Sequence, residues 1–155
     1  MNIELEWHKP VSLHDGRNQS LILTCDLNLI PEAPGVYVFA RVHGESRSPQ
    51  YIGRSANLRQ RIKQHLENDV KLMQQIDSAK NGKRILMMAT MVFKKGQRKD
   101  TVLDIVEKTL IEHAFSEGCE LLNKKGTKTP VHHMNSTGKK VDHFPFPRNM
   151  ARKAR

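Results

Sequence analysis

Alternating apolar and polar residues mark the first clear elements of the chain. Residues 36–42 place valine and alanine on one parity, and Tyr37 lies on the other parity with larger side chains. This alternation is typical of a β-strand. A polar loop with a glycine follows, and residues 50–53 form a second extended run. We predict that the two strands pair in antiparallel fashion, which would bring Tyr51 near Tyr37.

Longer periods and continuous apolar runs predict the remaining core elements. Apolar residues recur with helical spacing over residues 56–68, with Ser55 as the expected N-cap, and again over 70–79. Residues 85–93 are apolar on both parities, which is typical of a central strand covered on both faces. An amphipathic helix is predicted over 101–116. The pattern indicates an α+β fold, with a small central antiparallel sheet of about three strands flanked by helices.

The two ends of the chain differ from this middle part. Residues 3–7 alternate apolar with polar residues, and 21–23 form a second apolar patch. We predict that they form an N-terminal hairpin packed on the main sheet. The expected division is an N-terminal extension over 1–30, the main domain over 31–123 and a basic C-terminal extension over 124–155. Little fixed structure is expected near the C-terminus, which is rich in proline and cationic residues.

Positive charge is concentrated in the C-terminal extension. The chain has 26 Lys and Arg against 16 Asp and Glu, a net charge of +10, and its isoelectric point is near 9.9. Residues 124–155 contain nine Lys or Arg and a single acid, Asp142, so the first 123 residues carry only +2. A basic segment beside a nearly neutral domain suits a polyanion such as nucleic acid. The alternative is a solvated tail that keeps a small protein soluble.

Several classes of protein and site are not supported by the sequence. No apolar run approaches the length of a membrane span, and the N-terminus lacks a signal pattern. Cys25 and Cys119 lie far apart without metal-ligand spacing, as expected for reduced cysteines. The pair His132 and His133 has no second ligand pair at zinc spacing. We therefore expect a cytoplasmic protein with no membrane partner; its oligomeric state is open.

One carboxylate in the last predicted helix is unusually placed. On a helical wheel Glu107 falls inside the apolar stripe, close to Leu103 and Ala114, whereas Glu112 points to the opposite side. A carboxylate desolvated in this way needs a compensating partner. Either an arginine, for which Arg61 is a candidate, or a divalent cation would serve.

The helix predicted over 56–68 places two further polar groups together. Arg61 and His65 are four residues apart and lie on one edge of its apolar stripe, whereas Arg59 lies on the other edge. Taken singly, Arg61 is interpretable as a surface residue whose stem covers the core, and His65 as a boundary histidine. Their proximity to the strand that carries Tyr51 favours a functional interpretation.

These residues, taken in order along the chain, resemble the GIY-YIG nuclease family over roughly residues 34–123. The spacer between the two tyrosines and the segment after the glutamate are both longer than the family pattern. The shared features are Gly35-Val36-Tyr37, an intact Tyr51-Ile52-Gly53, Arg61 eight residues after Gly53, His65 four residues later, Glu107 before Leu110 and Ile111, and Asn123 after Leu121 and Leu122.

The resemblance implies a metal-dependent endonuclease and a role for each matching residue. Tyr37 would take a proton from the attacking water, and His65 would accept or relay it. A nearby cation is expected to lower the pKa of Tyr37. Arg61 would hold the scissile phosphate, and Tyr51 would position phosphate or water. Glu107 would bind one divalent ion, Mg²⁺ or Mn²⁺.

Nucleic acid is the implied partner, with double-stranded DNA expected and RNA left open. Two other classes compete. A non-catalytic basic module would grip DNA or RNA, with Tyr37 and Tyr51 as stacking or core residues. A ribosomal-type structural protein would explain the basic extension but not the placement of Glu107. The residues expected to contact the substrate are Arg54, Arg59, Asn123, Lys124 and Lys125.

Overall fold

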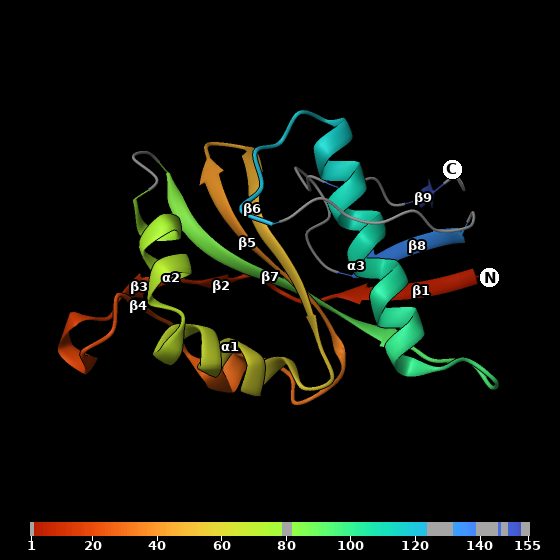
Figure 1. The fold of residues 1–155 in the computed structure, drawn as a ribbon, viewed down its shortest axis with the longest axis horizontal. Helices are drawn as coiled ribbons and strands as arrows, with labels where there is room; N and C mark the ends of the chain where they lie inside the picture. The colour runs from red at the N-terminus through yellow and green to blue at the C-terminus, as the bar shows by residue number, and fades with distance from the viewer. Residues whose placement is uncertain (1, 79–81, 124–131, 139–145, 147–148, 153–155) are drawn as a thin grey trace.

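The computed structural model describes residues 2–78, 82–123, 132–138, 146 and 149–152. Figure 1 shows one curved sheet with helices on both sides. The main sheet has the strand order β6-β5-β7-β1-β8-β9, and β2 pairs with β7. Its strands are β1 (Asn2–Trp7), β2 (Val11–Ser12), β5 (Gly35–His43), β6 (Ser46–Ser55), β7 (Lys83–Val92), β8 (His132–Gly138) and β9 (Asn149–Arg152).

The predicted core of three antiparallel strands is confirmed. Strand β5 lies between β6 and β7 and is antiparallel to both. Residues 85–89 of β7 are all buried, as the apolar run on both parities predicted. The α+β class is therefore confirmed, although the sheet has more strands than the expected three or so. The helices are α1 (Leu58–Asn68), α2 (Val70–Asp77) and α3 (Lys99–Ser116).

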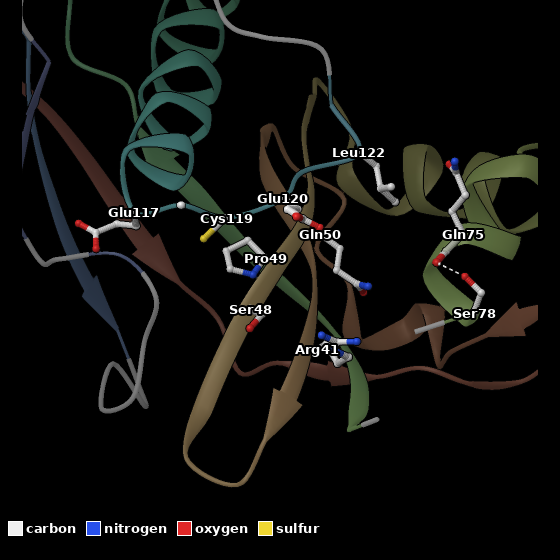
Figure 2. A pocket seen from close by; sticks show the side chains of 11 residues that line it. Arg41, Ser48, Pro49, Gln50, Gln75, Ser78, Glu117, Cys119, Glu120 and Leu122 are labelled. Carbon is white, nitrogen blue, oxygen red and sulfur yellow. Dashed lines mark hydrogen bonds between the residues drawn. The ribbon is translucent and has the colours of Figure 1, made fainter. Parts of the chain in front are cut away.

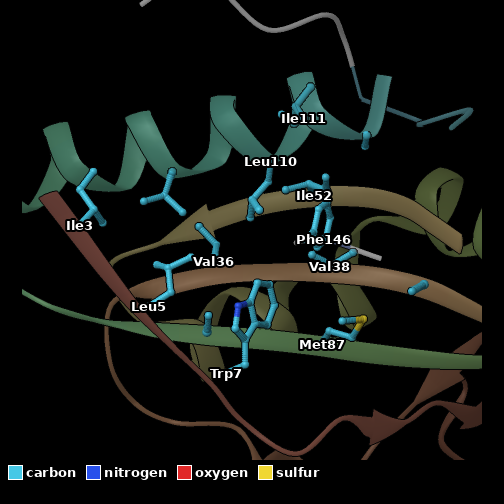
Figure 3. Packing of buried hydrophobic residues seen from close by; sticks show 14 of the residues in the cluster. Ile3, Leu5, Trp7, Val36, Val38, Ile52, Met87, Leu110, Ile111 and Phe146 are labelled. Carbon is cyan, nitrogen blue, oxygen red and sulfur yellow. The ribbon is translucent and has the colours of Figure 1, made fainter. Parts of the chain in front are cut away.

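The alternation along β5 separates two hydrophobic cores. Val36 and Val38 pack with α3 on one face, and Tyr37 and Phe39 pack with α1 and α2 on the other. All four side chains are at most 1% exposed. Figure 3 shows the α3 core, where Leu110 lies over β6 and β5. The functional side chains of β5 thus extend from a strand that is anchored on both faces.

The N-terminal hairpin predicted from residues 3–7 and 21–23 is wrong. Strand β1 instead pairs with β7 in the main sheet, in antiparallel fashion. Its inward residues Ile3, Leu5 and Trp7 are at most 3% exposed and complete the α3 core. Leu23 belongs to a small separate sheet, in which β4 (Leu23–Thr24) pairs with β3 (His14–Asp15). The reason is that β5 pairs with only one edge of β7. When β1 pairs with the other edge, its apolar residues are buried under α3.

The expectation of little fixed structure near the C-terminus is also wrong for the described residues. Strand β8 pairs parallel to β1, and β9 pairs antiparallel to β8. Phe146 is 3% exposed and stacks on Trp7 with ring centroids 6.2 Å apart. The sheet includes strands from all three predicted segments of the chain, and the functional division of those segments stays a prediction.

Helix α1 and the segment before β5 frame one side of the site. Helix α1 begins at Leu58 with Asn57 as N-cap, two residues beyond the predicted Ser55, and the Asn57 side chain accepts a hydrogen bond from the Gln60 amide. Two 3₁₀ turns, η1 (Arg17–Gln19) and η2 (Leu27–Leu29), lie in the segment before β5.

Within the described residues, none of the helices combines the length and apolar character that a membrane crossing requires.

Candidate active site

A continuous chain of polar groups crosses the core between β5 and α1. The Tyr37 hydroxyl lies 2.6 Å from Nε2 of His65, and Nδ1 of His65 lies 3.2 Å from Oδ2 of Asp69. A carboxylate only accepts hydrogen bonds, so Nδ1 carries the hydrogen and Nε2 accepts from the phenol. Tyr37 is 1% exposed and His65 is 2% exposed. The fold therefore holds a phenol, an imidazole and a carboxylate in series.

Burial controls the protonation of this chain. It raises the pKa of Tyr37, against the opposing effect of a hydrogen bond from Arg61. The predicted lowering of this pKa by a nearby cation is confirmed for Arg61, but desolvation outweighs it, so the net shift is upward. Burial and the charge of Arg61 lower the pKa of His65, and the hydrogen bond to Asp69 opposes them. At neutral pH the site holds a protonated phenol beside a neutral imidazole.

Tyr51 joins the same cluster from the neighbouring strand. Phe39 pairs with Tyr51 across β5 and β6, and the rings of Tyr37 and Tyr51 stack with centroids 6.4 Å apart. The ring of Tyr51 also lies edge-on to His65 at 5.7 Å. Tyr51 is half-buried, and burial raises its pKa. The predicted proximity of the two tyrosines is confirmed.

Both motif glycines are required by close approach. A Cβ atom on Gly53 would overlap the ring and hydroxyl of Tyr37, which crosses directly over it. A Cβ atom on Gly35 would overlap the carbonyl oxygen of Ala89 and lie 2.8 Å from Cδ1 of Leu58. The first glycine lets Tyr37 reach His65, and the second lets β5 pack between β7 and α1.

Arg61 lies at the solvent side of the cluster. Its side chain is exposed, and Nη1 lies 3.4 Å from Oε1 of Gln64. The pKa of Arg61 is raised, chiefly by its hydrogen bond to Tyr37 and against the effect of burial. The guanidinium therefore contacts the buried phenol while remaining open to solvent. A planar cation in this position suits a phosphate oxygen.

Glu107 approaches the cluster from the opposite side of β6. Its side chain is 23% exposed, and Oε1 lies 3.8 Å from Nε of Arg54. Burial raises its pKa, the Arg54 charge lowers it and Asp104 raises it. The Glu107 charge also raises the pKa of Tyr37 and Tyr51, which shows that it lies within electrostatic reach. The arginine beside this carboxylate is thus Arg54, whereas the sequence had suggested Arg61.

Two carboxylates near Arg54, those of Glu107 and Asp104, are the candidate ligands for a metal ion. Asp104 is one turn before Glu107 and also contacts Arg54, with 3.5 Å between Oδ1 and Nη2. No group of three or more His, Cys, Asp or Glu side chains in the described part of the chain is arranged to hold a metal ion. Magnesium commonly takes one or two carboxylates and completes its shell with waters and substrate phosphates. Glu107 fits such a partial donor set, whereas Oδ2 of Asp104 is held by Nζ of Lys108 at 2.7 Å.

The other predicted substrate contacts are engaged within the protein or lie outside the described residues. Arg59 donates to the carbonyl of Ile30 at 2.9 Å and pairs with Glu32 at 3.1 Å. The amide of Asn123 accepts from the nitrogen of Ile52 at 2.8 Å and donates to its oxygen at 2.6 Å. Asn123 therefore acts as a pairing partner for β6. The substrate contacts predicted for these residues and for Arg54 stay predictions. Lys124 and Lys125 lie outside the described residues.

Asp69 is the member of the site that the sequence analysis missed. It lies four residues after His65, the same spacing that linked Arg61 to His65, so the signal was present. Its Oδ1 also accepts a hydrogen bond from the nitrogen of Leu72 at 3.3 Å, which caps α2. The helix break between α1 and α2 therefore positions a carboxylate behind the histidine.

Comparison with known proteins agrees with this geometry. Residues 33–117 match the model of the GIY-YIG catalytic domain. No curated protein and no solved structure matches the chain. The matched region spans more than half of the chain and includes Tyr37, Tyr51, Arg61, His65 and Glu107. The chain therefore belongs to the GIY-YIG catalytic domain family, whose members are nucleases that hydrolyse phosphodiester bonds.

Proposed function

We propose that this protein is a DNA endonuclease that depends on a single divalent cation and uses Tyr37 as its general base. The observation that carries the proposal is the 2.6 Å contact between the Tyr37 hydroxyl and Nε2 of His65. The contact lies beside a solvent-open Arg61 and faces Glu107 across β6. A candidate general base, a cation that can bind phosphate and a carboxylate that can bind metal thus lie around β6.

The proton path follows from the pKa shifts. A phenol with a raised pKa is a weak base unless its own proton can leave. Neutral His65 accepts the Tyr37 proton at Nε2 while the phenol oxygen takes a proton from the attacking water. Asp69 then stabilises the imidazolium through Nδ1. Tyr37 is protonated again when the proton returns along this path.

The phosphate is held and the leaving group departs on the other side of the site. Water attacks phosphorus, the bond from phosphorus to the 3′ oxygen breaks, and Arg61 neutralises charge on the phosphate oxygens. A divalent cation bound by Glu107, with Mg²⁺ or Mn²⁺ expected, would stabilise the leaving oxygen and supply a water that protonates it. Tyr51 stacks on Tyr37, and we expect it to position phosphate or water.

Double-stranded DNA is the proposed substrate. The net charge of +10 supplies phosphate contacts that do not depend on sequence. Phosphate contacts from the nine Lys and Arg residues after residue 123 would make the binding strongly salt-dependent. Cleavage assays with matched DNA and RNA duplexes distinguish the two substrates.

The first test is plasmid nicking by the purified protein with Mg²⁺, with Mn²⁺ and with chelator. The key variant is Glu107→Gln, and Glu112→Gln in the same helix is the matched control. We expect metal-dependent cleavage that falls by at least about 100-fold in Glu107→Gln and is unchanged in Glu112→Gln. Equal cleavage by the wild type and Glu107→Gln would place the metal site on another carboxylate.

The second candidate function is a non-catalytic module that binds DNA or RNA. The observation that favours it is the full burial of Tyr37, since a side chain that is 1% exposed also fits a purely structural role. It predicts no cleavage of plain, branched or modified substrates. It also predicts tight, salt-sensitive binding that is retained in Tyr37→Phe and Glu107→Gln.

A further inference from the structure

A polar cavity of about 550 Å³ lies at the edge of the sheet, near the tyrosine cluster. Figure 2 shows it between β6, the end of α2 and the chain that follows α3. Its volume is in the range of sites that hold a small organic group. The lining includes Arg41, Ser48, Pro49, Gln50, Ser78 and Leu122.

Gln50 enters the cavity because β6 is bulged at this residue. Tyr51 pairs with Phe39 and Pro49 pairs with Ala40, so Gln50 is the extra residue in β6. A bulge at a sheet edge redirects a side chain out of the regular alternation. In Figure 2 the Gln50 side chain extends from the strand toward Gln75 of α2 and Ser78, the residue that follows α2. The bulge thus aims a carboxamide into the cavity.

Two buried polar atoms in the cavity wall have no hydrogen-bond partner among the described residues. They are Oε1 of Gln50, an acceptor, and Nε of Arg41, a donor. Figure 2 shows the polar ends of both side chains directed toward the same space. Buried polar groups are normally paired, and an unpaired one costs stability. A donor and an acceptor left open together indicate a ligand that offers the complementary pair.

The cavity adjoins the site directly along β6. Gln50 immediately precedes Tyr51, a step of about 3.3 Å along a strand. On the other wall, Leu122 immediately precedes Asn123, and its nitrogen donates to the Gln50 carbonyl at 2.7 Å. A ligand in the cavity would therefore lie one residue along β6 from Tyr51, next to the proposed phosphate site.

The lining selects among the parts of a nucleic acid. Glu117 and Glu120 lie at the cavity and would repel a phosphate. Pro49 and Leu122, the latter 39% exposed, offer apolar surface to a flat ring. Every nucleobase has flat apolar faces and an edge on which donors and acceptors lie side by side. These features favour a base over a phosphate or a sugar.

We propose that this cavity binds an unstacked nucleobase of the substrate beside the scissile phosphodiester, with Arg41 donating to the base edge and Gln50 accepting from it. The inference rests on the proposed function for the identity of the substrate. A base must leave the stack to enter the cavity. The protein should therefore prefer certain bases at that position, or DNA structures in which the base unstacks easily.

The test measures binding separately from cleavage. The Glu107→Gln protein, with and without Gln50→Met, is titrated by fluorescence anisotropy against labelled DNA duplexes that carry one abasic site at successive positions. Gln50→Met is expected to weaken binding of the intact duplex by about 10-fold. At one abasic position the two proteins should bind equally, because the base that Gln50 contacts is missing.

Thermal unfolding separates this role from a structural one. Methionine matches the length of glutamine, and Oε1 of Gln50 has no partner to lose. The unfolding midpoint of Gln50→Met should therefore be unchanged or higher, as should that of Gln74→Met, an exposed control on α2. A lower midpoint together with equal loss of affinity for intact and abasic DNA would overturn the proposal.

Failure of this inference is distinguishable from failure of the proposed nuclease. Metal-dependent cleavage by the wild type, with kcat/KM unchanged in Gln50→Met and Arg41→Met on every duplex, would overturn the base site alone. The expected abasic pattern in a protein that cuts nothing would support the base site and overturn the nuclease.

Discussion

The two sides of β6 differ in how deeply their polar groups are buried. On the α1 side, Tyr37, His65 and Asp69 form a hydrogen-bonded series, with the first two at most 2% exposed. On the α3 side, Arg54, Asp104 and Glu107 are between 23% and 37% exposed. Their closest contacts with Arg54 are 3.5 and 3.8 Å.

This difference separates two kinds of functional group. Groups that pass a proton need fixed distances, and the folded core supplies them before substrate arrives. Groups that hold a phosphate or a cation must exchange partners, so the partly exposed positions on the α3 side suit them. Variants on the two sides should therefore fail in different ways, and the following predictions test that distinction.

Tyr37→Phe should have the largest effect among the side chains of the α1 side. It removes the phenol that would exchange the proton, so the cleavage rate should fall by about 10²- to 10⁴-fold. Stability should fall by about 1–3 kcal/mol, because the buried Nε2 of His65 loses its hydrogen-bond donor. Single-turnover cleavage and urea unfolding measure the two quantities. Retained cleavage would show that Tyr37 is a core residue and remove the main distinction between the two sides.

Asp69→Asn should have the next largest effect. Asparagine is also a good N-cap, so the contact with Leu72 that begins α2 is retained while the charge behind His65 is removed. A hydrogen bond to a charged group is worth about 1.5–3 kcal/mol, which corresponds to a rate loss of roughly 10- to 100-fold. Asp69→Ala removes both contacts and should in addition unfold at a lower temperature. If these variants cleave DNA at the wild-type rate and only their unfolding midpoint shifts, Asp69 serves only as the N-cap of α2.

The stability of the α1 side should depend on pH through His65. Its pKa is lowered in the folded protein, whereas the unfolded chain binds the proton near the ordinary value of about 6.5. The contribution of neutral His65 to the free energy of unfolding is therefore fully present above about pH 6.5. It decreases as the pH falls from there through the pKa of folded His65. Urea unfolding at several pH values should show a shallower decline in His65→Gln than in the wild type. Parallel declines would assign the effect to other histidines.

Arg54→Gln should produce the smallest change in stability. Its ion pairs are long, and its 3.0 Å hydrogen bond to the Asp100 carbonyl is exposed, so the free energy of unfolding should fall by only about 1 kcal/mol. DNA binding should weaken evenly across sequences, and the slope of log K against log salt should decrease in magnitude by about one. A loss of several kcal/mol would instead show that Arg54 anchors α3 to the sheet.

Much of the site could be predicted because its signals are local. Alternation along residues 36–42 and 50–53 predicted that Tyr51 lies near Tyr37, and the wheel predicted a desolvated Glu107. The spacing of four residues that placed Arg61 beside His65 also applied to Asp69. That residue was missed because it lies at a helix break, where the apolar stripe used as the guide had ended.

The residue patterns by themselves determined the α+β class and the central antiparallel strands, and they predicted the polar groups around β6 except Asp69. Only the tertiary structure decided that Arg54 meets Glu107, that Asn123 pairs with Ile52 and that β1 joins the main sheet. It also decided that burial outweighs Arg61 at Tyr37. The physical reason is that each of these outcomes depends on contacts and desolvation between segments distant in sequence, which periodicity along one segment does not encode.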